Sequence, residues 1–273
     1  MIPPVSILMS ACNEEAFISE AIDSMLRQTF GEFELLIIDD GSTDRTRAII
    51  RGYDDPRIRL LCNDGNRGLS WSLNHGLQHC RSDLVARMDA NDVADPTRLE
   101  KQIARFRSRP AVDLIWTGAV YMTRDGELLC PKRSPGLREA VALLKTSPSS
   151  LPVGRNNVNH MTVMFRRAAV LRVGGYSEQH RWGQDGNLWY RMLQAGAEFE
   201  YLEEPLMKIR LLPHSVTGAR HGHSRTSEHE YYANICRLNG HYREALRQVA
   251  RMPWSLGKLR LYASTVKQRL GSS

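Results

Sequence analysis

The chain has 273 residues, of which 42% are hydrophobic and 25% are charged, as is ordinary for a folded globular protein. This length suits one large domain, or one domain with an appendage. No stretch reaches the roughly 18 to 20 apolar residues of a membrane-spanning helix, and the first residues do not resemble a signal peptide. The composition therefore predicts no membrane span.

The five cysteines are widely spaced, and none forms a Cys-x-x-Cys pair. This pattern favours reduced thiols over a disulfide framework or a zinc site. Reduced thiols are typical of a reducing compartment. We therefore expect a cytoplasmic protein.

The net charge of +7 is concentrated near the end of the sequence. From His241 onward there are seven Lys and Arg residues against one acidic residue, Glu244. A nucleic-acid-binding protein would carry a broad basic face, whereas this chain carries a localised basic appendage. The charge distribution therefore argues against nucleic acid as a partner.

Short apolar runs alternate with amphipathic segments over residues 1–118, which is typical of buried strands alternating with helices. In chain order, the predicted elements are a strand at 5–10, a helix at about 14–27, a strand at 34–39, a helix capped by Ser42 or Thr43 and ending near 51, a strand at 57–61, a helix at 68–80, a strand at 83–89, a helix from about 96, a strand at 111–118, a helix at 183–196 and helical segments after Pro213. The alternation predicts an α/β fold with a mostly parallel, doubly wound sheet.

Polar side chains cluster where two of the predicted strands end. They are Asp39, Asp40, Asp89, Asn91 and Asp92. In doubly wound sheets, ligands bind at the carboxyl ends of the strands, so these residues mark a candidate ligand site. A simpler alternative for the acids after the fourth strand, Asp95 included, is that they cap the next helix.

Seven segments resemble, in order, the motifs of the family 2 inverting glycosyltransferases, which have the GT-A fold. The segments are "VSILMSACNEE", "LLIIDDGSTDRT", "NRGLSWSLNHGL", "ARMDANDVADPTRLEKQ", "HMTVMFRRAAVLRVGGY", "GQDGNLWYRM" and "IRLLPHSVT". The resemblance implies a GT-A catalytic domain at 1–218, with a nucleotide-binding half at about 1–118 and an acceptor half at about 119–218. Residues 219–273 are then a basic, helical appendage.

The resemblance also implies a donor site for a nucleotide-diphosphate sugar, expected to be a UDP-sugar. The implied donor-binding residues are Ala11, Asn13, Glu14, Asp39, Asp40, Arg67 and Asp89. A divalent cation, Mn²⁺ or Mg²⁺, would neutralise the diphosphate, and its implied ligands are Asp89, Asn91, Asp92 and His214. Asn91 stands where the family has Asp, and a neutral amide oxygen is a weaker ligand for a hard cation.

Asp185 is the implied catalytic residue. Inverting transfer is a single displacement that needs a general base within reach of the acceptor hydroxyl, and Asp185 occupies that position of the family motif. Gln184 replaces the usual acidic neighbour. The simpler alternative is that Asp185 only caps its helix. His160 and Trp182 are the implied acceptor-side residues.

The resemblance implies transfer to a glycan or lipid-linked acceptor in the biosynthesis of a cell-surface polysaccharide. The basic tail mixes apolar residues with cations. This pattern predicts either association with an anionic membrane surface or a helical cap on the catalytic domain.

Two other functions compete with transfer. A sugar nucleotidyltransferase would need a Gly-rich, basic loop after the first strand, where this chain has the acidic, glycine-free "SACNEE". A degenerate nucleotide-sugar-binding or scaffold subunit would explain Asn91 and Gln184, although the retained acids, Asp185 among them, argue against it.

Overall fold

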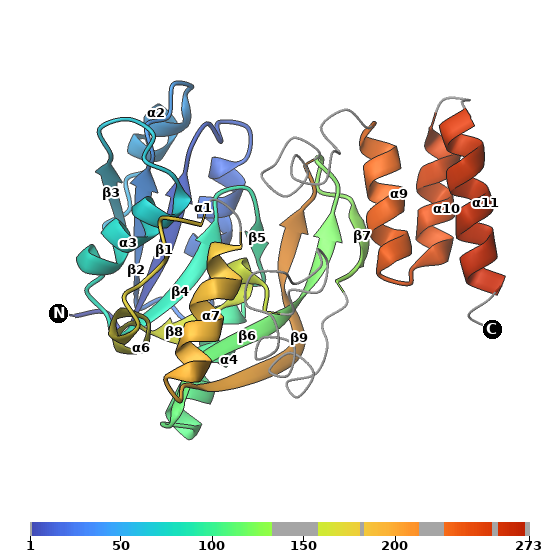
Figure 1. Ribbon diagram of the computed structural model, residues 1–273. Coiled ribbons are helices and arrows are strands. Elements are labelled where there is room, and N and C mark those ends of the chain that lie inside the picture. The colour runs from blue at the N-terminus through green and yellow to red at the C-terminus, as the bar shows by residue number, and fades with distance from the viewer. Residues whose placement is uncertain (1, 133–157, 181–182, 213–226, 253–255, 271–273) are drawn as a thin grey trace. The chain divides into compact units, whose positions relative to one another are not determined.

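The structure is a computed structural model, and it describes residues 2–132, 158–180, 183–212, 227–252 and 256–270 (Figure 1). The helices and strands are β1 (Val5–Ala11), α1 (Ile18–Leu26), β2 (Phe33–Asp39), α2 (Thr46–Arg51), β3 (Ile58–Cys62), α3 (Leu69–His79), β4 (Leu84–Asp89), β5 (Val93–Ala94), α4 (Arg98–Ser108), β6 (Val112–Met122), β7 (Leu128–Pro131), the 3₁₀-helix η1 (His160–Thr162), β8 (Met164–Arg166), α6 (Arg167–Arg172), α7 (Gln184–Gln194), β9 (Glu198–Arg210), α9 (Glu228–Leu238), α10 (Tyr242–Arg251) and α11 (Leu256–Leu270).

The chain divides into two compact units. The first comprises residues 1–118 and 134–207, and the second comprises residues 119–133 and 208–273. The division of function proposed from the sequence, with boundaries at residues 118 and 218, stays a prediction.

The strands form one sheet in the order β3-β2-β1-β4-β8-β6-β9-β5, with β7 paired to β6. The neighbours β3, β2, β1 and β4 are parallel, whereas β8 is antiparallel to both β4 and β6. Helices flank this sheet (Figure 1). The predicted α/β fold with a parallel central sheet is confirmed.

The register of the parallel strands brings their carboxyl ends into one row. Ala11 of β1 lies opposite Asp39 of β2, and Asp39 lies opposite Cys62 of β3. On the other side of β1, Ser10 lies opposite Asp89 of β4. The acids that end β2 and β4 therefore share one edge of the sheet, with β1 between them.

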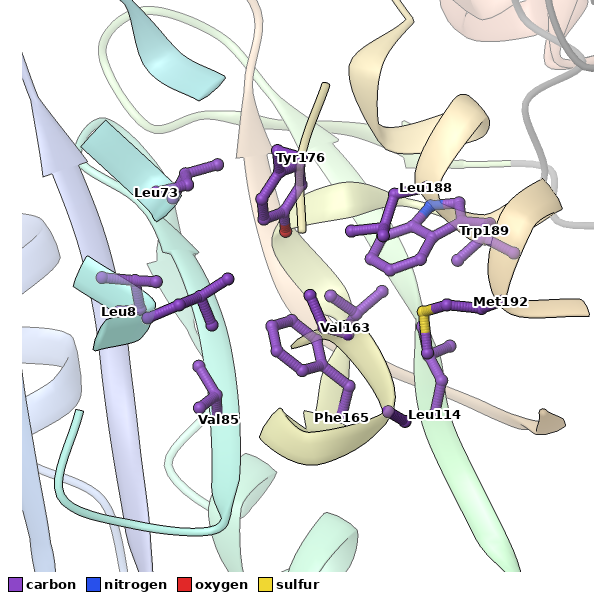
Figure 2. Packing of buried hydrophobic residues seen from close by; sticks show 14 of the residues in the cluster. Leu8, Leu73, Val85, Leu114, Val163, Phe165, Tyr176, Leu188, Trp189 and Met192 are labelled. Atoms are coloured by element: carbon purple, nitrogen blue, oxygen red, sulfur yellow. The ribbon is translucent and has the colours of Figure 1, made fainter. Parts of the chain in front are cut away.

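The core of the first unit is built from apolar side chains of the sheet and of α3, α6 and α7. Leu8 of β1, Val85 of β4, Phe165 of β8 and Trp189 of α7 are all fully buried in it (Figure 2). Burying one such side chain contributes roughly 1.5–3 kcal/mol, so this cluster holds the helices on the sheet. Trp189 is a core residue, as its helical spacing in the sequence indicates.

Helix α1 begins at Ile18, four positions later than the predicted start near Glu14. The residues before it form a loop that is hydrogen-bonded to the segment after β2. In particular, the backbone N–H of Glu14 donates to Thr46 Oγ1 at 2.8 Å. This long-range contact, which periodicity does not reveal, replaces the first predicted turn of the helix.

Helix α2 begins at Thr46 with Arg45 at its N-cap, and no side chain caps it. The prediction that Ser42 or Thr43 is the cap is therefore wrong. Ser42 Oγ instead accepts from the N–H of Asn13 at 3.0 Å, and the N–H of Thr43 donates to Asn13 Oδ1 at 2.8 Å. Ser42 and Thr43 therefore join the loops after β1 and β2 and do not cap α2.

The sequence pattern missed β9, the longest strand, with 13 residues. Its middle is exposed and acidic, at Glu203 and Glu204, so it lacks the continuous apolar run of a buried strand. Tertiary pairing within the sheet overrides the weak local preference here.

In the second unit, α9, α10 and α11 pack against one another, and α9 also contacts β7 (Figure 1). A small core joins β7 to α9, and it contains Cys130, Tyr231, Tyr232 and Cys236. The predicted helical, basic C-terminal appendage is confirmed. None of the helices in the described part of the chain combines the length and apolar character needed to cross a membrane.

Candidate functional site

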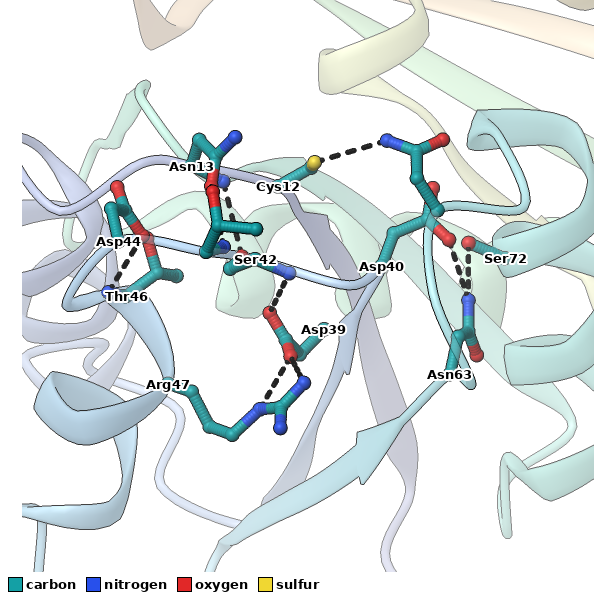
Figure 3. A network of polar contacts seen from close by, with 12 residues as sticks. Cys12, Asn13, Asp39, Asp40, Ser42, Asp44, Thr46, Arg47, Asn63 and Ser72 are labelled. Carbon is teal, nitrogen blue, oxygen red and sulfur yellow. Dashed lines mark hydrogen bonds and ion pairs between the residues drawn. The ribbon is translucent and has the colours of Figure 1, made fainter.

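The loops that follow β1 and β2 hold each other through Asn13 (Figure 3). Asn13 adopts a left-handed backbone conformation, with φ of 57°, which Asn tolerates better than most residues. Its side-chain oxygen accepts from Thr43, and its N–H donates to Ser42. Asn13 thus fixes the shape of the rim above Ala11, where the nucleotide is expected.

Asp39 lies at the end of β2 and is fully buried. Its Oδ2 accepts from Arg47 Nε at 2.7 Å and forms an ion pair with Arg47 Nη2 at 2.6 Å, while its Oδ1 accepts from the N–H of Ser42 at 3.2 Å (Figure 3). In this structure Asp39 anchors α2 to the sheet. Its predicted proximity to the ribose stays a prediction.

Asp40 organises the loop between β3 and α3. Its Oδ1 accepts from Asn63 Nδ2 and from the N–H of Arg67, both at 2.8 Å, and its Oδ2 accepts from the N–H of Gly68 at 2.9 Å. A carboxylate has about four lone-pair directions, so three are taken and about one remains for a ligand donor.

A close backbone approach next to Asp40 fixes the same loop. Gly41 has φ of 72°, and a Cβ placed on it would lie 2.4 Å from the carbonyl carbon of Gly65. The two loops meet backbone to backbone here, so only glycine fits at position 41.

Several carboxylates lie close enough to the Cys12 thiol at this edge to affect its pKa. Burial raises the pKa of the Cys12 thiol, the charges of Asp40, Asp39 and Glu14 raise it further, and a hydrogen bond from Asn66 opposes them. Such an edge suits hydrogen-bond donors and a cation. The exposed guanidinium of Arg67 supplies one cation, and it lies 4.7 Å from the centre of the Trp71 ring.

A cluster of buried charges supports the end of β4. Arg87 is 1% exposed and forms an ion pair with Asp89. Beneath it, Arg98 is fully buried and donates to the carbonyls of Arg87 at 2.8 Å and of Val163 at 3.2 Å. Burial and the charge of Arg87 lower the pKa of Arg98 to about 9, while Asp92 and Asp89 oppose that shift.

The residues implied as metal ligands lie near one another only in part. Asn91 Nδ2 is 3.4 Å from Glu14 Oε1, and Asp92 is buried with its N–H 3.5 Å from the carbonyl oxygen of Asp89. His214 lies outside the described residues. Within the described part of the chain, no group of three or more His, Cys, Asp or Glu side chains is arranged to hold a metal ion.

Asp89 nevertheless fits a cation that is shared with a bound diphosphate. Its side chain is 29% exposed, and only Oδ1 is held by Arg87. Mg²⁺ is commonly held by one or two carboxylates together with substrate phosphates and water, rather than by a complete protein cage. Asp89 therefore has one oxygen, Oδ2, of the kind that such a cation takes as a ligand.

The buried hydroxyl of Tyr176 is influenced by charged residues from two elements of the candidate site. Burial raises the pKa of its hydroxyl, and the charges of Asp185 and Asp89 raise it further, against the opposing effect of Arg87. Asp185, in the first turn of α7, and Asp89, at the end of β4, therefore both lie within electrostatic range of one buried hydroxyl.

His160 is part of the same buried region. Its Nε2 is 2.9 Å from the Tyr176 hydroxyl, and its ring packs edge-on against Trp189. Burial lowers the pKa of His160 well below its usual value, and the charge of Arg87 lowers it further, so the ring is neutral. Its predicted contact with the acceptor stays a prediction. Trp182 lies outside the described residues.

An open depression of about 560 Å³ lies beside this region. Asn74, Tyr176, Glu178, Asn187 and Arg191 are among its lining residues. Asn74 Nδ2 donates to the carbonyl of Tyr176 at 2.8 Å, and Arg191 Nε donates to Asn187 Oδ1 at 2.9 Å. Its polar lining suits hydroxyl-rich ligands.

Sequence reasoning missed three residues that organise the site: Arg87, Arg47 and Tyr176. Arg87 left a readable signal, because it stands two positions before Asp89 in an apolar strand, and residues i and i+2 share a face. Arg47 and Tyr176 left none, since their partners depend on how loops and helices pack.

Residues 6–170 match the family model for glycosyl transferase family 2. The chain belongs to this family. The amylovoran biosynthesis glycosyltransferase AmsE of Erwinia amylovora is 30% identical over 209 residues, which cover 75% of each chain. An Escherichia coli UDP-Gal:alpha-D-GlcNAc-diphosphoundecaprenol beta-1,3-galactosyltransferase is 26% identical over 221 residues, which cover 76% of this chain and 74% of that one.

Solved structures agree on the fold. The mannosyltransferase PcManGT of Pyrobaculum calidifontis, in complex with GDP-Man and Mn²⁺, superposes with a TM-score of 0.58 at 15% identity, covering all of this chain and 76% of that one. The family 2 glycosyltransferase resemblance drawn from the seven motifs is thereby confirmed, and the protein is a glycosyltransferase.

Proposed function

We propose that this glycosyltransferase moves a sugar from a UDP-sugar to a hydroxyl of a lipid-linked glycan, with inversion at the anomeric carbon, in the biosynthesis of a cell-surface polysaccharide. The names of the two relatives support this assignment, since one acts in amylovoran biosynthesis and the other acts on a diphosphoundecaprenol-linked sugar. The acceptor would be reached at the cytoplasmic face of a membrane, with the basic tail on anionic lipid.

The donor would bind at the shared edge of β1, β2 and β4. Asp40 retains about one lone-pair direction for a ring N–H of the base, and a uracil presents such a donor. The UDP-Gal of the E. coli relative supports uridine, whereas the GDP-Man of the P. calidifontis complex represents the competing guanine. The nucleotide specificity therefore depends on whether uracil or guanine donates to Asp40.

Asp89 would hold the divalent cation together with the donor diphosphate, and the cation would supply charge neutralisation for the leaving group. Arg87 orients Asp89 from below through their ion pair. Asn91 would offer the cation only a neutral oxygen, which weakens rather than removes the site. Asp92 is buried near Arg98, so it contributes mainly as a counter-charge to that guanidinium.

Asp185 would accept the proton of the attacking acceptor hydroxyl. The observation that carries this assignment is that His160 pairs with the Tyr176 hydroxyl and packs against Trp189, one helical turn after Asp185 in α7. The element that contains His160, η1, packs on β4, which ends at Asp89. In-line displacement needs the base and the leaving group on opposite faces of the same sugar, so the two carboxylates must belong to one region. The depression lined by Tyr176 and Asn187 lies along the same helix, α7, and is a candidate place for part of the acceptor.

A transfer assay with the purified chain tests the proposal. The chain would be incubated with a panel of UDP- and GDP-sugars and a lipid-diphosphate-linked GlcNAc acceptor, and the product anomer would be read by NMR. We expect transfer from a UDP-sugar with an inverted anomeric centre. Transfer only from a GDP-sugar would overturn the uridine assignment, and a retained configuration would overturn the inverting mechanism.

The competing function is a degenerate nucleotide-sugar-binding subunit, which the substitutions at Asn91 and Gln184 favour. Calorimetry with UDP in the same buffer separates the two. Binding of UDP without transfer or donor hydrolysis from any sugar of the panel would support the subunit, whereas turnover excludes it.

A further inference from the structure

Among the described residues, helix α11 packs against its neighbours along one side. Leu261 and Thr265 are buried, and Gln268 accepts from Arg237 of α9 at 3.1 Å. These three side chains recur at helical spacing, so together they define the face of α11 that rests on its neighbours in the second unit.

A second apolar stripe runs along the other side of α11. Leu259 is 52% exposed, Tyr262 is 53% exposed, and Ala263 is also exposed, with Val266 half-buried beside them. These residues stand at i, i+3, i+4 and i+7, so they share one face. At 3.6 residues per turn this face lies roughly opposite Leu261. We call Leu259, Tyr262, Ala263 and Val266 the outer stripe.

Exposed cations border the outer stripe on both edges. Arg260 and Lys267 lie along one edge and Arg269 along the other, by the same helical geometry. Helix α11 contains no Asp or Glu. None of the three cations forms an ion pair with a residue in the described ranges of the chain, so their charge faces outward.

We propose that the outer stripe of α11 docks on an anionic lipid bilayer, with Leu259 and Tyr262 at the headgroup–acyl boundary and Arg260, Lys267 and Arg269 among lipid phosphates. Apolar side chains flanked by cations are the pattern of a helix that lies in a membrane interface. A second copy of the chain is a poorer occupant, because it would bring a like-charged stripe against this one. The proposal deepens the membrane association in the proposed function, rests on it, and commits it to one helix face.

The first test is flotation of the full chain with vesicles of pure phosphatidylcholine or with added phosphatidylglycerol. No donor or acceptor is present, so the result is independent of whether transfer occurs. We expect the chain to float with anionic vesicles and to stay largely free with neutral ones, and binding should fall as salt rises. Equal partition to both vesicle types would overturn the electrostatic part of the proposal.

The second test uses variants of the outer stripe. Leu259→Glu with Tyr262→Glu should lower partition by about tenfold or more, because apolar burial is replaced by like charge. Arg260→Gln with Lys267→Gln should lower it roughly fivefold for each cation removed. Leu171→Glu is the matched control, since Leu171 is a 46% exposed leucine on α6, and it should float like the wild type.

Circular dichroism and light scattering without lipid complete the design. The stripe variants should keep the helical signal and the thermal midpoint of the wild type, so that lost flotation reports lost docking. If the folded variant with Leu259→Glu and Tyr262→Glu floats as well as the wild type, the proposal is overturned. A wild-type dimer that becomes monomeric in that variant would also overturn it, by identifying a second copy as the occupant.

Discussion

Arg87 and Asp89 form an ion pair on one face of β4, and Arg87 is only 1% exposed. The pair places the Asp89 carboxylate at the edge of the sheet, while the Arg87 guanidinium is buried. Taking one partner away from such a pair leaves a buried charge uncompensated, which costs more than the intact pair contributes.

The pair predicts a non-additive effect on stability. Asp89→Ala should lower the free energy of unfolding by about 3 kcal/mol, and adding Arg87→Met to it should recover part of that loss. Urea denaturation of the two single variants and the double variant measures the coupling. Simple additivity of the two single effects would contradict a supporting role for Arg87. Donor binding should be weakened in every variant that lacks Asp89.

Gly41 predicts a structural effect on the nucleotide loop. Gly41→Ala places a Cβ 2.4 Å from the carbonyl carbon of Gly65, at a backbone φ of 72°. We expect a loss of about 1–3 kcal/mol in the free energy of unfolding, together with weaker UDP binding, because the Asp40-held loop must move. Gly31→Ala is the control, since no atom lies within 4 Å of its added Cβ. Unchanged UDP affinity in Gly41→Ala would separate this loop from the donor site.

His160 predicts a pH dependence of stability. The buried ring has a pKa well below its usual value because of burial and then Arg87. The unfolded chain takes up a proton below about pH 6.5, so it binds more protons than the folded chain there. The free energy of unfolding should therefore fall as pH falls below about 6.5, by up to about 1.4 kcal/mol per pH unit.

Urea denaturation between pH 7.5 and pH 5.5 measures this slope. His160→Gln can still pair with the Tyr176 hydroxyl but does not titrate, so its slope should be flatter. His241→Gln changes a histidine outside this buried region and should keep the slope of the wild type. An unchanged slope in His160→Gln would contradict the neutral, buried ring.

The cysteines predict a graded reactivity. Cys62 is exposed, whereas Cys130 and Cys236 are buried with their sulfur atoms 3.1 Å apart. The hydrogen bond with Cys130 and burial both raise the pKa of Cys236, which suppresses its reactive thiolate. A thiol reagent should modify Cys62 quickly in the folded protein, and Cys130 and Cys236 only after unfolding. Recovery of fewer than five free thiols in denaturant would contradict the reduced state expected from the spacing.

The parallel strands β1 to β4 were predictable from the sequence because each is a short apolar run ended by polar residues. The acids at Asp39 and Asp89 follow directly from those ends, and the parallel register then places them on one edge. Strand β9 was not predictable in this way, because its exposed acidic middle hides it.

The partners of the site residues were less predictable. Asp40 is held by the loop at Asn63 and Gly68, more than twenty positions away, and no periodic pattern encodes such contacts. Likewise, the pairing of Tyr176 with His160 beside Trp189 of α7 depends on how distant segments pack together. The motifs thus indicated the candidate site residues, whereas they gave no indication of the residues that hold those candidates in place.

The most direct measurement is the turnover of Asp185→Asn in the transfer assay. Asn retains the size of Asp185 but cannot accept the proton, so kcat should fall by about 10²- to 10⁴-fold while donor affinity changes only a few-fold. Glu100→Gln, an acidic residue in the first turn of α4, is the matched control and should leave kcat unchanged. The N-cap of α7 is Gly183 and no side chain caps the helix, so capping is not the role of Asp185. Turnover of Asp185→Asn within about threefold of the wild type would contradict its role as the base.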